Sequence, residues 1–305
     1  GAPHRASTLF CALFLRTLLV IRSLCCNFAL NNPLTIYPIM IDFSKLAEQY
    51  KHELLDQVIP FWMNHSIDTQ FGGFLHCLER DGSVFDTDKF VWMQGREVWM
   101  LSKLYNTVHE PTVSAETRQQ WLDAAIQGAE FLKSKAHDGN LNFYFSLDRE
   151  GHPLVEPYNI FSYTFAIIAF GQLALATGNE EYADIARRTF DIVLSKVDNP
   201  KGRWNKAASG ARAMKSFALP MILCNVALEI EHLLSPDFLQ ETMETCIHEV
   251  MEVFYRPELG LIVEHLSMDN ELVDCMDGRL MNPGHAIEAM WFIMDLGKRL
   301  NRPEL

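Results

Sequence analysis

Residues 281–292 contain a histidine and a carboxylate spaced by one helical turn. Pro283 interrupts the preceding structure and Asn282 can accept from the first free backbone amides, so a helix is expected to begin here. His285 and Glu288 then share one face of that helix. The helix dipole disfavours the imidazolium while Glu288 favours it, and we expect His285 to stay nearer its neutral form. Such an imidazole suits a general base; the alternative is a histidine that only packs near the helix start.

A second motif places an arginine among tryptophans. Trp92, Arg96 and Trp99 occur at positions i, i+4 and i+7 of a predicted helix, on its apolar stripe. A guanidinium there costs free energy unless an anionic or strongly accepting group meets it. Sugar rings stack on indoles, and arginine can stabilise an oxyanion. The alternative is an arginine that extends along the helix surface to reach water.

The rest of the chain alternates helices with short strand-like segments. Hydrophobic periodicity predicts helices at 43–64, 88–107, 114–136, 160–176, 179–196, 215–233, 236–254 and 284–301. Alternating segments that end in turn residues predict β-hairpins at 73–83, 141–152 and 261–271, with a degenerate loop near Gly202 to Arg212.

Two helices in each period of about 60 residues indicate an all-α toroid of helical hairpins around a central cavity. Six such units need roughly 400 residues, so we interpret the chain as an incomplete toroid, truncated at its C-terminus. An open α-solenoid, which presents a concave surface without enclosing a pocket, is the alternative.

Composition excludes several classes of protein. The 305 residues are 49% hydrophobic and carry a net charge of −13, which argues against binding to nucleic acid or to anionic membranes. The seven cysteines show no CxxC spacing and fit reduced thiols of a cytosolic protein. No HExxH, P-loop or EF-hand pattern occurs, so neither a metal nor a P-loop nucleotide site is indicated.

Residues 1–39 differ from the remainder. Their apolar run from Leu9 to Ile21 is too short to span a bilayer, and Arg16 within it weakens a secretory signal. We interpret residues 1–39 as a foreign or mistranslated leader outside the fold, with a targeting segment as the alternative. The folded domain is then 40–305, with Met40 as the natural start.

Three stretches together resemble the N-acylglucosamine 2-epimerase family, which includes animal proteins also called renin-binding protein. The matching residues are 72–82, 89–99 and 278–291, and the similarity extends from about residue 42 to the end. The resemblance implies an (α/α)6 barrel and an isomerase of carbohydrate metabolism. The reaction would be reversible C2 epimerisation of N-acetylglucosamine and N-acetylmannosamine, an amino sugar used in sialic acid metabolism.

The resemblance also assigns residues. It implies two histidines on opposite sides of the sugar, of which His285 matches the first, with Glu288 beside it to orient it. Arg96 matches an arginine that contacts the sugar oxygens, and Tyr144 matches a pocket tyrosine. Trp92 and Trp99 would shape the pocket and exclude water. The second histidine is expected beyond Leu305, and without it we expect the chain not to epimerise its substrate, although exchange of the C2 proton on one face could persist.

Two other functions remain open at this point. One is a non-catalytic, protein-binding toroid of the renin-binding type. The other is an (α/α)6 glycoside hydrolase, which needs two carboxylates across a pocket. Carboxylates are available in the predicted hairpins, but turn chemistry explains them without catalysis; they are Glu79, Asp81, Asp148, Glu150 and Glu264.

The family resemblance further implies the cofactors, partners and cellular location of the protein. The chemistry requires no redox or metal cofactor, and ATP is the activator of some family members. The expected partner is a small amino sugar, with no nucleic acid and no membrane. A homodimer and renin binding are both consistent with the family, and the expected location is the cytoplasm.

Overall fold

The computed structural model describes residues 42–157, 159–196, 208 and 210–305. These residues form two compact units, which are described separately: the first contains 42–67 and 75–87, and the second contains 68–74 and 88–305. The prediction made for residues 1–39 lies outside the described residues, as does most of the degenerate loop predicted near Gly202 to Arg212.

The first unit is a helical segment followed by a hairpin. Asp42 caps the segment by accepting from the Lys45 amide at 3.0 Å. The helix predicted at 43–64 is confirmed, except that a π-helical turn interrupts it. Its parts are α2 (Phe43–Glu53), η2 (Leu54–Val58) and α3 (Ile59–His65), and the hairpin pairs β1 (Cys77–Leu78) with β2 (Val84–Asp86).

The turn of this hairpin requires glycine. Gly82 has a φ of +87°, a left-handed conformation that side chains rarely adopt, and a Cβ there would lie 2.3 Å from the His65 ring. The Asp-Gly signal that predicted the first hairpin therefore has both a conformational and a steric basis.

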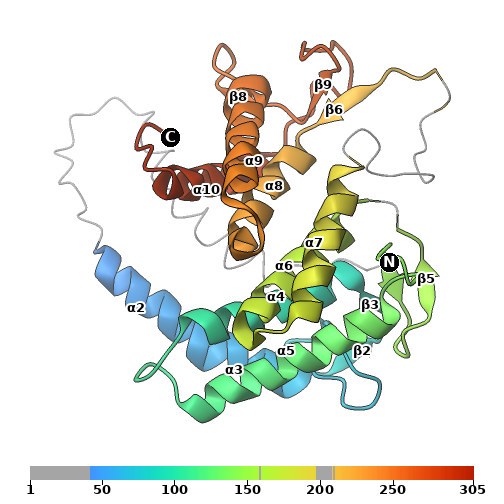
Figure 1. Cartoon of the computed structure of the whole chain (residues 1–305), viewed down its shortest axis with the longest axis vertical. Helices are drawn as coiled ribbons and strands as arrows, with labels where there is room; N and C mark the ends of the chain where they lie inside the picture. Colours follow the sequence, from blue (N-terminus) through green and yellow to red (C-terminus); the bar gives the residue numbers. More distant parts are fainter. Residues whose placement is uncertain (1–41, 158, 197–207, 209) are drawn as a thin grey trace. The chain divides into compact units, whose positions relative to one another are not determined.

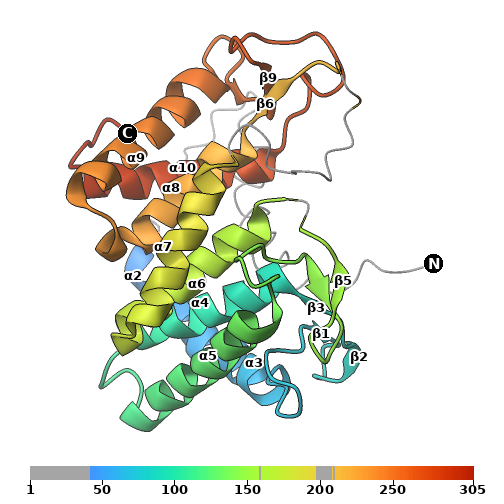
Figure 2. The same cartoon turned by 45° about the vertical axis from the view of Figure 1, so that its right-hand side comes forward.

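The second unit consists of two layers of helices (Figures 1 and 2). Helices α4, α6, α8 and α10 contact one another in that order, and α5, α7 and α9 each pack against the helix before them. The helix bounds are α4 (Val91–Thr107), α5 (Ala115–Lys135), α6 (Phe161–Thr177), α7 (Glu180–Leu194), α8 (Ala218–Glu229), η4 (Glu231–Leu233), α9 (Pro236–His248), η5 (Glu249–Phe254) and α10 (Pro283–Arg299). The predicted helices of this unit are thus confirmed, with ends displaced by a few residues.

Helices α6 and α7 show how sequence determines the layer. Residues Ser162 to Ala174 of α6 are all buried, because the helix is apolar on every side and contacts α4, α5, α7 and α8. In α7, charged residues occupy one face, and the buried residues lie on the other. A helix that is apolar all round takes the inner layer, and an amphipathic one covers it.

Short strands connect the helices. One sheet pairs β3 (Lys89–Phe90) with β4 (Ser146–Leu147) and β4 with β5 (Pro153–Val155), which confirms the second hairpin. Two further sheets pair β6 (Met214–Ser216) with β9 (His265–Ser267), and β7 (Tyr255–Arg256) with β8 (Leu261–Ile262).

The hairpin predicted at 261–271 is wrong in its pairing. A turn does form, since the Ser267 amide donates to the Glu271 carbonyl at 3.0 Å. However, β8 pairs with β7, the strand that precedes it, and β9 pairs with β6, which lies about fifty residues earlier in the chain. The alternation of apolar and polar residues identified the strand-forming residues but did not indicate which strands pair with each other. Strand β6 also occupies the start of the helix predicted at 215–233, which begins at Ala218 instead.

The described part of the chain is therefore mostly helical, with strands of two or three residues. None of its helices combines the length and the apolar character needed to cross a bilayer.

Candidate active site

Helix α10 begins where the sequence indicated. Pro283 is its first residue, and Asn282 accepts from the Gly284 amide at 3.0 Å. This start places His285 in the first turn and Glu288 one turn later, on the same side of the helix.

The imidazole of His285 is held by Glu264, a residue outside α10. Its Nδ1 lies 3.1 Å from Oε1 and 3.0 Å from Oε2 of Glu264. The Glu264 side chain is only 7% exposed, whereas that of His285 is 33% exposed. The hydrogen-bonding partner expected for His285 was Glu288, so the structure replaces an i, i+3 neighbour with a carboxylate 21 residues away.

This contact also corrects the expected charge state. The hydrogen bond that Glu264 accepts from the ring raises the pKa of His285; burial opposes this, and the negative charges of Glu264 and Glu288 reinforce it. The prediction that the helix dipole would hold the imidazole nearer its neutral form is therefore wrong, because a buried carboxylate in direct contact outweighs a partial charge at the helix end.

Backbone hydrogen bonds on both sides fix the position of Glu264. Its amide donates to the Leu280 carbonyl at 3.2 Å, and its carbonyl accepts from the Phe217 amide at 2.9 Å. Leu280 precedes α10 and Phe217 precedes α8, so Glu264 connects the starts of two helices in the inner layer.

Arg96 supplies a cation from α4. Its guanidinium lies over the rings of Trp92 and Phe165, 5.3 and 4.6 Å from their centroids. Burial lowers the pKa of Arg96, and the negative charge of Glu288 partly offsets this. Glu288 thus acts electrostatically on both Arg96 and His285. Among the described residues the guanidinium has no hydrogen-bond acceptor, so its donors are available to a ligand.

A close helix crossing positions the Phe165 ring. A Cβ on Gly95 would lie 2.8 Å from the backbone carbon and oxygen of Phe165, so α4 and α6 touch almost backbone to backbone at this point. The guanidinium of Arg96 therefore lies next to an aromatic ring from the neighbouring helix. The helical spacing alone predicts Trp99, and not Phe165, on the second side of Arg96.

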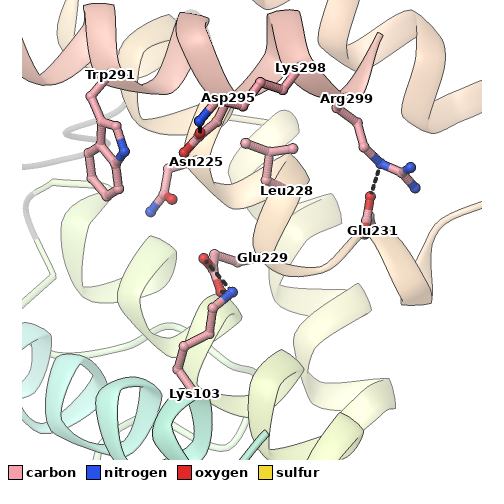
Figure 3. A pocket seen from close by; sticks show the side chains of 9 residues that line it. All are labelled: Lys103, Asn225, Leu228, Glu229, Glu231, Trp291, Asp295, Lys298 and Arg299. Atoms are coloured by element: carbon pink, nitrogen blue, oxygen red, sulfur yellow. Dashed lines mark hydrogen bonds and ion pairs between the residues drawn. The ribbon is translucent and has the colours of Figure 1, made fainter. Parts of the chain in front are cut away.

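Trp99 interacts with a different group. Its indole N–H donates to Oε2 of Glu229 at 2.9 Å, and Lys103 lies 3.0 Å from the same oxygen. Lys103 and Glu229 border a cavity of about 450 Å³ between α4, α8 and α10 (Figure 3). The lining side chains are Lys103, Asn225, Leu228, Glu229, Glu231, Trp291, Asp295, Lys298 and Arg299.

The charges around this cavity are paired with one another. Figure 3 shows Arg299 with Glu231 and Lys103 with Glu229, and Lys298 lies 3.3 Å from Asp295. Each cation therefore already has an anionic partner in the wall. Arg96, in contrast, has no hydrogen-bonded partner in the part of the chain that the structure describes.

Tyr144 stays a prediction. Its amide donates to the Ala136 carbonyl at 2.9 Å, which fixes the backbone of the second hairpin, but no described contact joins its side chain to His285 or Arg96. Within the described segments no three His, Cys, Asp or Glu side chains are grouped as metal ligands.

Sequence reasoning missed Glu264 and Phe165. The turn chemistry of the third hairpin explained Glu264 as a turn carboxylate. However, Glu264 follows an apolar segment and does not lie in the turn itself, and this position indicates burial. Phe165 belongs to a helix that is apolar throughout, so nothing in its local pattern distinguished it from its neighbours.

The inner layer of helices thus carries an imidazole with a buried carboxylate partner on α10 and, on α4, a guanidinium with no hydrogen-bond acceptor among the described residues, and the charge of Glu288 acts on both. An imidazole and a guanidinium of this kind are suited to proton transfer and to binding an oxyanion. The family model for N-acylglucosamine 2-epimerase (GlcNAc 2-epimerase) matches residues 73–305, and the chain belongs to this family.

Individual relatives agree with this family. The chain is 37% identical to the N-acylglucosamine 2-epimerase of Rattus norvegicus over 257 residues, which are 82% of this chain and 60% of the rat protein. It is 34% identical to that of Homo sapiens over the same number of residues, 58% of the human protein. The chain therefore spans about 60% of the length of the curated relatives it matches.

The fold is similar to that of solved sugar epimerases. The structure of cellobiose 2-epimerase from Bacillus thermoamylovorans matches with a TM-score of 0.70 and 18% identity, covering 84% of this chain and 67% of that one. At this identity the match describes the fold alone.

Proposed function

We propose that the protein is a sugar isomerase that epimerises N-acetylglucosamine and N-acetylmannosamine at C2. One observation carries the proposal: Arg96 has no hydrogen-bond acceptor among the described residues, and the charge of one carboxylate, Glu288, acts on both Arg96 and His285. The reaction needs a base and a cation that binds an oxyanion. The family match and the named relatives support the substrate class.

The reaction depends on the acidity of one carbon. The C2 proton of an open-chain aldose can be removed because the resulting enediolate is delocalised onto the C1 oxygen. A base takes the proton on one face of the carbon, and an acid returns one on the other face. His285 performs the transfer on one face, and a second histidine is inferred for the other from the family resemblance.

Arg96 binds the developing oxyanion through its free N–H groups. A preorganised donor of this kind typically contributes 10²–10³ in rate. Trp92, stacked against Arg96, offers an apolar surface for a sugar ring. Tyr144 and Trp99 are proposed to border the sugar as well, and Glu288 sets the electrostatic balance between the cation and the imidazole.

The family resemblance supports a wider setting for this activity. We infer an (α/α)6 barrel in which α4, α6, α8 and α10 belong to the inner ring, because these helices contact one another in succession. No redox or metal cofactor takes part in the proposed chemistry. A cytoplasmic location, a role in sialic acid metabolism, a homodimer, activation by ATP and renin binding are proposals that rest on the family alone.

The decisive experiment follows the C2 proton. In deuterated buffer, the protein should exchange the C2 proton of N-acetylmannosamine with solvent, observed as loss of its ¹H NMR signal. His285→Asn should reduce this rate by at least 10², the smallest contribution expected of a general base. Appearance of N-acetylglucosamine in the same sample would report complete epimerisation, which requires the second histidine as well as His285.

The matched control is His248→Asn. The His248 Nδ1 lies 2.9 Å from Glu252, but both side chains are more than half exposed, so this variant removes a similar pair from the surface. It should retain the wild-type exchange rate. A folded His285→Asn variant that exchanges the proton within tenfold of the wild-type rate would remove His285 from the mechanism.

A further inference from the structure

A buried glutamate contacts the proposed base from outside its helix. We propose that Glu264 is the positioning residue of His285: it accepts the Nδ1–H, and thereby makes Nε2 the nitrogen that exchanges a proton with the sugar. This inference rests on the proposed function for its kinetic consequence, whereas the contact itself is structural.

The geometry of Glu264 suits it to hold a ring in place. Both carboxylate oxygens lie within 3.1 Å of Nδ1, and both backbone polar groups of Glu264 are hydrogen-bonded, to Phe217 and to Leu280. Because the side chain is 7% exposed, water competes little for its oxygens. The carboxylate is therefore fixed before substrate arrives.

The chemistry of the two partners determines the tautomer. An ionised carboxylate can only accept hydrogen bonds, so the nitrogen that faces it must carry the proton. In neutral His285 the lone pair then belongs to Nε2. Within the described part of the chain Nε2 has no hydrogen-bond partner, which leaves it available to a ligand.

The surrounding charges agree with this role. The charged groups that act on the pKa of His285 are Glu264 and Glu288, and the charge of Glu288 also acts on Arg96 of α4. When Nε2 takes the C2 proton, the imidazole becomes a cation, and Glu264 supplies the opposite charge at its other nitrogen. The same proton can then return to carbon or exchange with solvent, so no other reagent is consumed.

Glu288 does not fill this position. Among the described residues, Glu288 acts on His285 through its charge alone, and the same charge acts on Arg96. The two carboxylates thus have separate roles, since Glu264 fixes the ring and the charge of Glu288 acts on both the base and the oxyanion-binding cation.

The imidazole itself provides a test that does not depend on activity. Long-range ¹H–¹⁵N NMR spectra of the wild-type protein should show His285 in the Nδ1–H form, with a pKa above the ordinary value of about 6.5. Glu264→Gln should lower that pKa, because the charge is lost, while Glu252→Gln, the matched change at the exposed His248 pair, should leave His285 unchanged.

The kinetic test uses the pH dependence of C2 proton exchange. Below the pKa of His285 the base is protonated and the rate falls, so Glu264→Gln should shift this acidic limb to lower pH. The plateau rate should also fall ten- to hundredfold, the usual effect of losing a residue that orients a functional imidazole, with little change in KM. Glu264→Ala, which also removes the acceptor, should lose more.

The outcomes separate the two proposals. A His285 that titrates normally, or carries its proton on Nε2, would overturn the role of Glu264, and this is read in the unmodified protein even if a variant fails to fold. An unshifted pH profile in folded Glu264→Gln would overturn it too. If the spectra show the expected tautomer but His285→Asn retains exchange, the proposed function fails while the Glu264–His285 pair stands.

Discussion

Lys89 and Arg96 are two cations seven residues apart in one segment, and their environments differ. Lys89 is fully buried and donates to Asp68 Oδ2 at 2.9 Å, to the Gly72 carbonyl at 2.6 Å and to the Arg149 carbonyl at 2.8 Å. A lysine has three donors, so each one is satisfied. Arg96 has five donors, and none has a hydrogen-bond acceptor among the described residues.

Asp68, the anion that Lys89 contacts, likewise has both carboxylate oxygens hydrogen-bonded. Asp68 receives Lys89 and two hydrogen bonds from Arg149, at 3.0 and 3.1 Å. Burial by itself would raise the pKa of Asp68, but the hydrogen bonds from Arg149 and Lys89 outweigh it and lower the pKa well below its usual range. A cation whose donors are all hydrogen-bonded within the protein stabilises the fold. A partly buried cation whose donors lack acceptors is available to bind a ligand.

The largest expected effect on stability is at Lys89. Replacing it with methionine leaves the buried Asp68 carboxylate with Arg149 as its one cationic partner among the described residues, and should lower the free energy of unfolding by about 3–5 kcal/mol. Urea denaturation measures this. Lys298→Met, which removes an exposed i, i+3 partner of Asp295, should change the stability by less than about 0.5 kcal/mol. Equal losses in the two variants would show that the buried cluster has no special structural role.

At Arg96 we expect the opposite result. Arg96→Leu should reduce C2 proton exchange by about 10²–10³ while changing the free energy of unfolding by less than about 1 kcal/mol, since no hydrogen bond to the described residues is lost. Arg96→Lys, which keeps the charge but not the planar fork, should lie in between. A loss of stability as large as that of Lys89→Met would remove the distinction between the two cations.

The smallest effect is a pH dependence of stability at His285. Its pKa is raised in the folded state, so the pair with Glu264 stabilises the protein fully below the unfolded pKa of about 6.5, and this is lost as pH rises through the folded pKa. Wild type should therefore exceed His285→Gln in stability by more at pH 5.5 than at pH 8.5. Because His285 is one-third exposed, we expect a difference below about 1 kcal/mol.

The check is urea denaturation of both proteins at the two pH values, with His248→Gln as the exposed control. An advantage of wild type that grows toward high pH would contradict the raised pKa of His285.

Local signals predicted the scaffold well. The start of α10 followed from Asn282 and Pro283, because capping and proline geometry act within a few residues. The first two hairpins followed from turns such as Asp81-Gly82, whose glycine is required by its backbone conformation. Helix bounds were accurate to within a few residues for the same reason.

The misses are contacts between distant segments. Glu264 lies 21 residues before His285, and β9 pairs with a strand about fifty residues earlier, so neither appears in a helical or alternating pattern. Trp99 and Arg96 share a stripe, but Glu229, which binds the indole, comes from α8, 130 residues further along the chain. A sequence pattern shows which face of a helix is buried, whereas the tertiary fold determines which residues that face contacts.

The contact at Gly95 has a consequence for how this site can vary. Most helix interfaces contain a layer of side chains that can change rotamer to accommodate a substitution. Where α4 meets the backbone of Phe165 there is no such layer, and a single added methyl group must move a whole helix. In directed evolution of substrate preference, substitutions at residue 95 would therefore not be tolerated. Changes in preference would have to come from substitutions of the aromatic and carboxylate residues that act on Arg96.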